Sequence, residues 1–233
     1  MRVTVVRFPG SNCDHDVEHV YAALLNASVE TIWHKERDLK NPDLVILPGG
    51  FSFGDYLRTG ALARVSPIME EVKKFSDTGG KLIGICNGFQ ILCECGLLPG
   101  VLLRNINRKF LSRYVNIKVE NNLIPFTSKY ENGEIITCPV AHGEGNYFID
   151  PENLKALEGD GLVVFRYCDP NGNIDHENFE INPNGSMNSI AGISNKKGNI
   201  LGLMPHPERA AESIVGNIGN ASGLKVFESC LVQ

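Results

Sequence analysis

The chain is 233 residues long, enough for a hydrophobic core that needs neither disulfides nor a metal to fold. Its net charge of −5, without a basic stripe, argues against nucleic acid and anionic membranes as partners. Its seven cysteines lack the even count of a disulfide framework and zinc-ligand spacing, so we expect free thiols, a cytoplasmic location and no metal site. No stretch approaches the length of a membrane-spanning helix.

The first half of the chain alternates short apolar runs with helical patterns. β-Branched apolar runs predict buried strands, and apolar residues three and four apart predict helices. Because such alternation is typical of parallel sheets covered on both faces, we expect an α/β fold with a mostly parallel sheet flanked by helices. The expected elements are strands at Val3–Phe8, Val29–Trp33, Asp43–Leu47 and Lys81–Ile85, and helices at Asp14–Leu25 and Pro67–Ser76.

The second half is richer in predicted strands. A polar stretch, Asp169–Gly185, predicts a long surface loop, and Leu224–Leu231 predicts a closing helix. We find no repeat, linker or low-complexity segment, and therefore expect one domain over residues 1–233. The expected strands are Tyr114–Glu120, Gly133–Val140, Leu162–Tyr167, Ser189–Ile193 and Asn199–Met204.

The stretch KLIGICNGFQILCECG (residues 81–96) carries the strongest chemical signal. It predicts a buried strand, then Cys86 at a turn between Gly84 and Gly88, then an amphipathic helix. This is the thiol version of a nucleophile elbow, which lifts a reactive side chain clear of a sheet. Gln90, one helical turn on, shares the helix face of Cys86. The alternative is a buried structural cysteine, as we expect for the other six thiols, Cys13, Cys93, Cys95, Cys138, Cys168 and Cys230.

A second candidate segment is LGLMPHPER (residues 201–209), in which a strand delivers His206 and Glu208. Residues two apart in extended chain project to the same side, so Glu208 can orient the imidazole of His206. His206 can then accept a proton from Cys86. Without the elbow, a rigid loop with a solvated carboxylate would be the better interpretation.

The loop PGGFSFG (residues 48–54) follows the strand before the elbow. A glycine-rich loop there can offer a backbone N–H to an oxyanion, with the amide of Asn87 as a second donor. A phosphate-binding loop is disfavoured because the GKS/T signature is absent.

Together, GICNGFQ, the PGG loop and MPHPE resemble the class I glutamine amidotransferases, which have a flavodoxin-like fold. The motifs FPGSNCDHD, PGGFSFGDYLR, PVAHGEG, NPNGS and GLMPHPER further resemble the glutaminase subunits of phosphoribosylformylglycinamidine synthase. The resemblance implies Cys86 as nucleophile, His206 as base and Glu208 as its orienter. It also implies an oxyanion site at Gly50, Phe51 and Asn87, and glutamine contacts from Gln90, His142 and Gly143.

The resemblance further implies that glutamine is hydrolysed here and that its ammonia passes to a partner. That partner is an ATP-dependent synthase subunit, accompanied by a small accessory subunit, which converts formylglycinamide ribonucleotide to the amidine in purine biosynthesis. We expect no cofactor in this chain, and ATP and magnesium on the synthase, because the sequence carries neither a Walker loop nor a carboxylate cluster for nucleotide-bound magnesium.

Two alternatives remain open from the sequence. One is a γ-glutamyl hydrolase, or a glutaminase that serves another pathway, on the same framework. The other is a non-catalytic binding subunit or redox sensor with an elbow cysteine. The His206–Glu208 pair disfavours the sensor, because a sensor thiol needs no proton shuttle.

Overall fold

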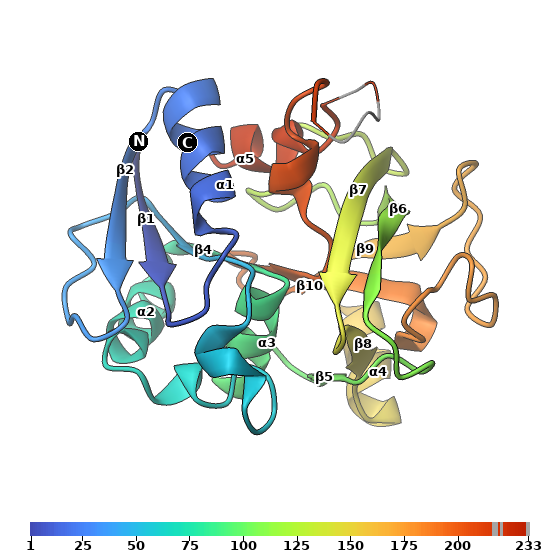
Figure 1. The fold of residues 1–233 in the computed structure, drawn as a ribbon. Helices are drawn as coiled ribbons and strands as arrows, with labels where there is room; N and C mark the ends of the chain where they lie inside the picture. The colour runs from blue at the N-terminus through green and yellow to red at the C-terminus, as the bar shows by residue number, and fades with distance from the viewer. Residues whose placement is uncertain (216–218, 220, 232–233) are drawn as a thin grey trace.

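A nine-stranded mixed sheet runs through the protein, in the order β2-β1-β3-β4-β11-β10-β9-β6-β7 (Figure 1). The structure is a computed structural model that describes residues 1–215, 219 and 221–231. One cluster of buried apolar side chains extends over both halves of the sheet. Among the described residues, no helix is long and apolar enough to cross a bilayer.

The first half of the sheet is parallel, as the alternating pattern predicts. Each neighbouring pair from β2 to β11 is parallel. Every residue of the central strand LVIL is buried, because helices cover both faces of the sheet. The strands are β1 (Arg2–Arg7), β2 (Ser28–Trp33), β3 (Leu44–Leu47), β4 (Lys81–Ile85) and β11 (Ile200–Leu203).

The second half of the sheet is antiparallel and carries the remaining predicted strands. Residues along β7 alternate between buried and half-buried, which is the pattern of a strand with one face on the core. The strands are β6 (Leu111–Val119), β7 (Ile135–His142), β9 (Val163–Cys168) and β10 (Ile190–Ser194). A separate two-stranded sheet of β5 (Val101–Leu103) and β8 (Asn146–Phe148) was not predicted.

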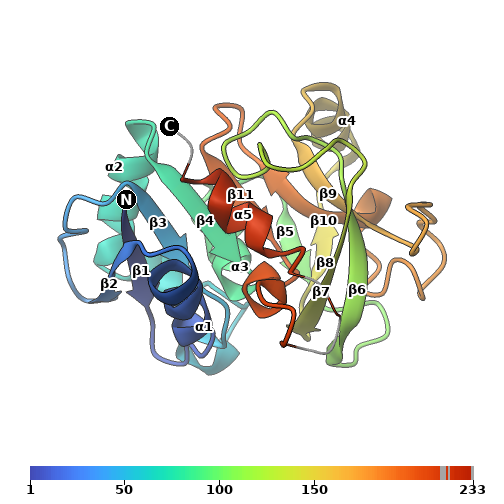
Figure 2. The same cartoon turned by 90° about the horizontal axis from the view of Figure 1, so that it is seen from above.

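Helices cover both faces of the parallel half. In Figures 1 and 2, α1 and α5 lie on one face and α2 and α3 on the other. The predicted first helix continues beyond α1 as a π-helical turn at Val20–Leu24. One helix, α4, was not predicted. The helices are α1 (Asp14–His19), α2 (Ile68–Asp77), α3 (Asn87–Glu94), α4 (Pro151–Gly159) and α5 (Leu224–Ser229).

The carboxyl ends of the parallel strands all lie at one edge of the sheet. There β1 leads into residues 8–13, β3 into the glycine-rich loop, β4 into Cys86 and β11 into His206. Ligands of open α/β sheets bind at this edge, so the topology brings the candidate residues together.

The helix after the elbow packs unusually close to the sheet. A Cβ atom on Gly88 would lie 1.9 Å from the backbone oxygen of Leu47, and one on Gly84 would lie 2.6 Å from the backbone of Gly88. Glycine at both positions therefore lets α3 approach β3 and β4 at backbone contact.

We expect Gly88→Ala to lower the free energy of unfolding by at least about 2 kcal/mol, because the new methyl group meets backbone atoms. Gly159→Ala is the matched control: a Cβ atom there would meet no atom of the described residues within 4 Å, so this substitution in α4 should be neutral or stabilising. Urea unfolding of the two variants checks this; equal stability would show that α3 can move away from the sheet without cost.

Candidate active site

Cys86 lies between β4 and α3 in a backbone conformation that residues with a side chain rarely adopt. Its φ is 50° and its ψ is −102°. Such strain costs on the order of 1–3 kcal/mol and is held by the surrounding contacts. The Cys86 N–H donates to the carbonyl of Leu203 at 2.8 Å, and its carbonyl accepts from Gln90 N–H at 3.1 Å. The structure therefore has the elbow that the sequence predicts.

His206 and Glu208 form a buried pair beside this elbow. The Nδ1 atom of His206 lies 2.6 Å from Oε1 of Glu208, and both side chains are at most 1% exposed. The chain turns into a 3₁₀ helix at Pro207–Ala210 rather than staying extended, yet the two side chains meet as predicted. The His206 N–H donates to the carbonyl of Pro139 at 2.8 Å, which ties this turn to β7.

The electrostatics of the pair favour a protonated imidazole. Burial by itself lowers the pKa of His206. Negative charge on Glu208 and Cys86 and the closeness of the Cys13 and Cys86 thiols outweigh burial, and hold the pKa of His206 well above its usual value. The Nε2 atom of His206 itself has no hydrogen-bond partner among the described residues. The imidazolium is thus placed to stabilise a thiolate and to donate a proton to a leaving group.

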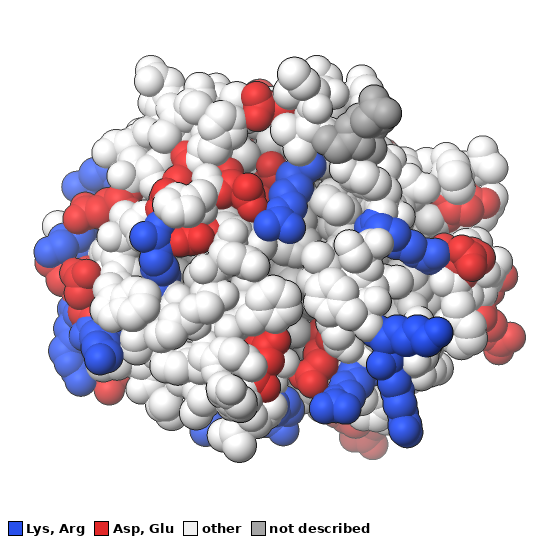
Figure 3. Space-filling view, viewed as in Figure 1, with Lys and Arg blue, Asp and Glu red and all other residues white. Residues whose placement is uncertain are grey.

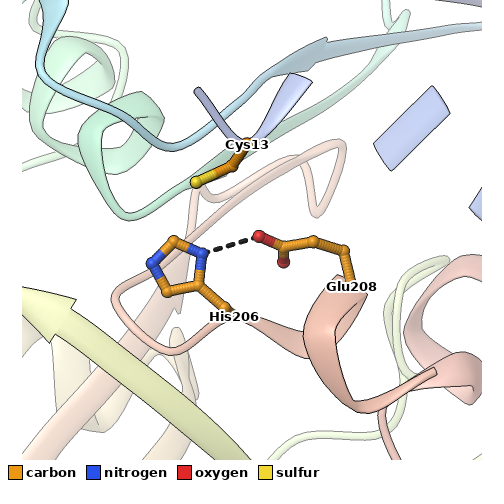
Figure 4. Close-up of side chains that lie close together, drawn as sticks. All are labelled: Cys13, His206 and Glu208. Carbon is orange, nitrogen blue, oxygen red and sulfur yellow. Dashed lines mark hydrogen bonds and ion pairs between the residues drawn. The ribbon is translucent and has the colours of Figure 1, made fainter. Parts of the chain in front are cut away.

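A second thiol, Cys13, lies at the same imidazole. Figure 4 shows its sulfur pointing toward the ring of His206. The ligand atoms of Cys13, His206 and Glu208 lie within 4.8 Å of one another, which is close enough to hold a metal. However, Arg209 Nη2 lies 3.2 Å from Cys13 Sγ, and this guanidinium disfavours a divalent cation there. From the sequence we expected Cys13 to be a small apolar residue, and its place at the imidazole was not predicted.

A cavity of about 250 Å³ opens over Cys86. Its size, just below the ~300–1,000 Å³ typical of pockets for drug-sized ligands, suits a single amino acid. Cys86 and five of the other predicted site residues line it: Gly50, Phe51, Gln90, His142 and Gly143. The cavity therefore gathers, around one space, residues that lie far apart in the chain.

The backbone N–H groups around the sulfur differ in their hydrogen bonds. Phe51 N–H donates to the carbonyl of Gly10 at 2.9 Å. Among the described residues, the N–H groups of Gly50 and Asn87 have no such acceptor, and that of Asn87 lies in the first turn of α3, where helices leave donors free. Gly50 has a φ of +145°, and a Cβ atom there would meet Gly10 O at 2.7 Å, so only glycine suits this position.

Asn87 and Gln90 form a network behind the cavity. The side-chain oxygen of Asn87 accepts from Ser52 N–H at 3.2 Å, and its amide nitrogen donates to Gln90 Oε1 at 3.0 Å. Gln90 Nε2 in turn donates to the carbonyl of Glu144 at 2.6 Å. The oxygen and the nitrogen of the Gln90 amide are thus both engaged in hydrogen bonds within the protein, and the rest of its side chain lines the cavity.

His142 is held by Asn105, a residue that was not predicted from the sequence. Asn105 Oδ1 accepts from His142 Nδ1 at 3.1 Å and from Gly145 N–H at 3.0 Å, and its Nδ2 donates to the carbonyls of His142 and Lys109. Burial, and then the charge of His206, lower the pKa of His142 to about 3. The ring is therefore neutral, with the proton on Nδ1, and Nε2 is an acceptor without a partner among the described residues.

The family model of the CobB/CobQ-like glutamine amidotransferase domain matches residues 1–229. The chain belongs to this family. Membership agrees with the geometry, in which an elbow cysteine lies beside a histidine–carboxylate pair. The resemblance seen in the sequence motifs is therefore confirmed at the level of the family.

Individual members of the family are similar over almost the whole chain. The phosphoribosylformylglycinamidine synthase subunit PurQ of Chlorobaculum tepidum is 56% identical over 227 residues, which cover 97% of this chain and 94% of the relative. The subunit of the same name from Thermus thermophilus is 53% identical over 229 residues, which cover 97% of this chain and 96% of the relative. A chain in the structure of PurLQS from Thermotoga maritima superposes with a TM-score of 0.82 at 44% identity. The superposition covers 99% of this chain and 97% of that chain.

Limiting iodoacetamide at neutral pH should modify Cys86 before any other thiol, because it lines the open cavity and faces a protonated imidazole. Burial raises the pKa of Cys95 to about 11 and that of Cys168 and Cys230 to about 12, which leaves these thiols protonated. Burial also raises the pKa of Cys13, Cys93 and Cys138. Peptide mapping by mass spectrometry gives the order of labelling, and faster labelling of Cys13 or Cys95 would contradict it.

Proposed function

We propose that this chain hydrolyses glutamine and delivers the ammonia to a partner synthase. The synthase uses ATP to convert formylglycinamide ribonucleotide to formylglycinamidine ribonucleotide in purine biosynthesis. The observation that carries the proposal is the strained elbow of Cys86 beside the His206–Glu208 pair, in a chain that matches PurQ subunits over nearly its full length.

In the first half of the reaction, the Cys86 thiolate attacks the carboxamide carbon of glutamine and forms a tetrahedral intermediate. The His206 imidazolium then gives its Nε2 proton to the departing nitrogen, so that ammonia leaves and a thioester remains on Cys86. Glu208 holds the ring through Nδ1 at 2.6 Å and stabilises its charged form.

In the second half, the neutral imidazole of His206 takes a proton from water as the oxygen attacks the thioester. Collapse of the second tetrahedral intermediate breaks the C–S bond, releases glutamate and regenerates the thiolate and the imidazolium. The triad therefore returns to its starting protonation after each turnover.

The oxyanion of each intermediate needs two N–H donors. Of the three residues expected from the sequence, we assign this role to the N–H groups of Gly50 and Asn87, because Phe51 N–H already donates to Gly10. Phe51 instead lines the cavity with its side chain, which stacks on Phe110 with ring centroids 6.2 Å apart. Gln90, His142 and Gly143 shape the space for the glutamine side chain.

The partner follows from the relatives. The similar proteins are named as subunits of phosphoribosylformylglycinamidine synthase, and the Thermotoga maritima structure is of PurLQS. We assign the synthase reaction, with its ATP and magnesium, to a PurL-like partner, and expect a small PurS-like subunit in the complex. We place the complex in the cytoplasm, where seven free cysteines would stay reduced.

We expect Cys86→Ala, in complex with the partner synthase, to abolish amidine formation from glutamine and to leave formation from ammonium largely intact. The substitution removes one sulfur atom at a turn, so docking should survive. Both reactions are measured side by side under saturating ATP, with Cys95→Ala as the matched thiol control outside the cavity. Loss of the ammonium reaction in an assembled Cys86→Ala complex would show that the two chemistries are not separable.

A further inference from the structure

Charged side chains of both signs line the cavity above the catalytic residues. Asp55 and Glu144 lie on its wall, and Arg104, Arg108 and Lys109 lie at its rim. Figure 3 shows acidic and basic side chains next to one another in the lower half of the face drawn. None of these five residues takes part in the chemistry proposed above.

Asp55 presents a carboxylate that pairs with no cation among the described residues. Its Oδ1 atom is buried and has no hydrogen-bond partner among the described residues. Burial, and then the charge of Glu144, raise the pKa of Asp55 to about 6. The Asp55 backbone adopts a left-handed conformation, with a φ of 54°. A buried carboxylate without a partner is costly, and a bound cation would relieve that cost.

Glu144 is held rigidly on the same wall. Its Oε2 accepts from Thr59 Oγ1 at 2.6 Å, and its carbonyl accepts from Gln90 Nε2 at 2.6 Å. Its contact with Arg104 is long, at 3.6 Å, and the Arg104 side chain is 80% exposed. Such a pair contributes little, so the charge of Glu144 stays available to the cavity.

Arg108 and Lys109 are carried by a turn that Asn105 fixes. Arg108 N–H donates to the carbonyl of Asn105 at 2.8 Å, and Asn105 Nδ2 donates to the carbonyl of Lys109 at 2.9 Å. Within the part of the chain that the structure describes, neither cation pairs with a carboxylate. The same Asn105 also forms a hydrogen bond with His142, so one residue positions both the rim and the floor of the cavity.

These charges are layered by depth. Cys86 and His142 at the floor are 4% and 3% exposed, Asp55 and Glu144 are half-buried, and Arg108 and Lys109 are exposed. The unpartnered Nε2 of His142 at the floor offers an acceptor to a substrate N–H group. A glutamine with its carboxamide on Cys86 would direct its α-carbon, with one positive and one negative group, toward the charged layers.

We infer that Asp55 and Glu144 bind the α-ammonium group of the substrate and that Arg108 and Lys109 bind its α-carboxylate. The site thereby selects a free zwitterionic amino acid and rejects glutamine within a peptide, which has neither charge. This inference rests on the proposed glutaminase function and adds the residues that determine its specificity. Asp55 is the central contact, because its buried oxygen has no other partner among the described residues.

The test compares two substrates on the assembled complex: L-glutamine and glutaramate, which is glutamine without its α-amino group. The wild-type complex should favour glutamine in kcat/KM by roughly 10- to 100-fold, the range expected for one lost hydrogen bond to a charged group. Asp55→Asn should lose most of this preference, through a higher KM for glutamine at nearly constant kcat. Its kcat/KM for glutaramate should not fall. If turnover of glutaramate is too slow, its inhibition constant against glutamine replaces kcat/KM.

The matched control is Asp38→Asn, which neutralises an exposed carboxylate outside the cavity and should keep the wild-type preference. Equal use of the two substrates by the wild-type complex would overturn the inference. An Asp55→Asn complex in which kcat/KM falls equally for both substrates would also overturn it, because that result indicates a structural role for Asp55. A wild-type complex that does not hydrolyse glutamine would refute the proposed function itself.

The rim is tested in the same way with the α-carboxamide of glutamine, which lacks the α-carboxylate. Arg108→Gln with Lys109→Gln should raise the KM for glutamine and leave that for the carboxamide unchanged. Lys155→Gln, on the exposed surface of α4, is the control. An unchanged KM for glutamine in the double variant would remove Arg108 and Lys109 from the inference.

Discussion

The backbone of Cys86 is the constraint on which the site depends. Its left-handed φ of 50° is held from both sides, by the hydrogen bond to Leu203 of β11 and by the close approach of Gly88 to Leu47 of β3. Strand β11 also leads into His206, so one strand holds the nucleophile in place and positions its base. Stability of the parallel half and reactivity of the thiol are thus two consequences of the same packing.

Much of the fold could be predicted from local patterns. Buried β-branched runs indicated the strands of the parallel half, and the long polar stretch 169–185 is irregular, as expected. The strands β5 and β8 were missed because three residues are too few to show a period. Helix α4 was missed although its signals were present, with Asp150 capping Asn153 N–H and Pro151 in the first turn. The antiparallel pairing of β6 with β9 joins residues far apart in the sequence, such as Ile117 and Tyr167, and no local pattern specifies it.

The residues of the candidate site likewise differ in whether a local sequence pattern reveals them. Cys86, His206 and Glu208 could be recognised because turn glycines and a spacing of two leave local signatures. Cys13 and Asn105 could not, since their importance comes from segments that meet only in the folded chain. The hydrogen bond of Phe51 N–H to Gly10 was also invisible, because a glycine-rich loop predicts exposed amides without saying which are engaged.

The most direct measurement locates the covalent adduct that glutamine leaves on the chain. The assembled complex, wild type and Glu208→Gln, is quenched with acid during turnover and mapped by mass spectrometry. We predict one glutamyl group on Cys86, more abundant in the variant, because a poorly oriented His206 slows hydrolysis of the thioester. A glutamyl group on Cys13, or steady glutamine hydrolysis with Cys86 unmodified in both complexes, would contradict it.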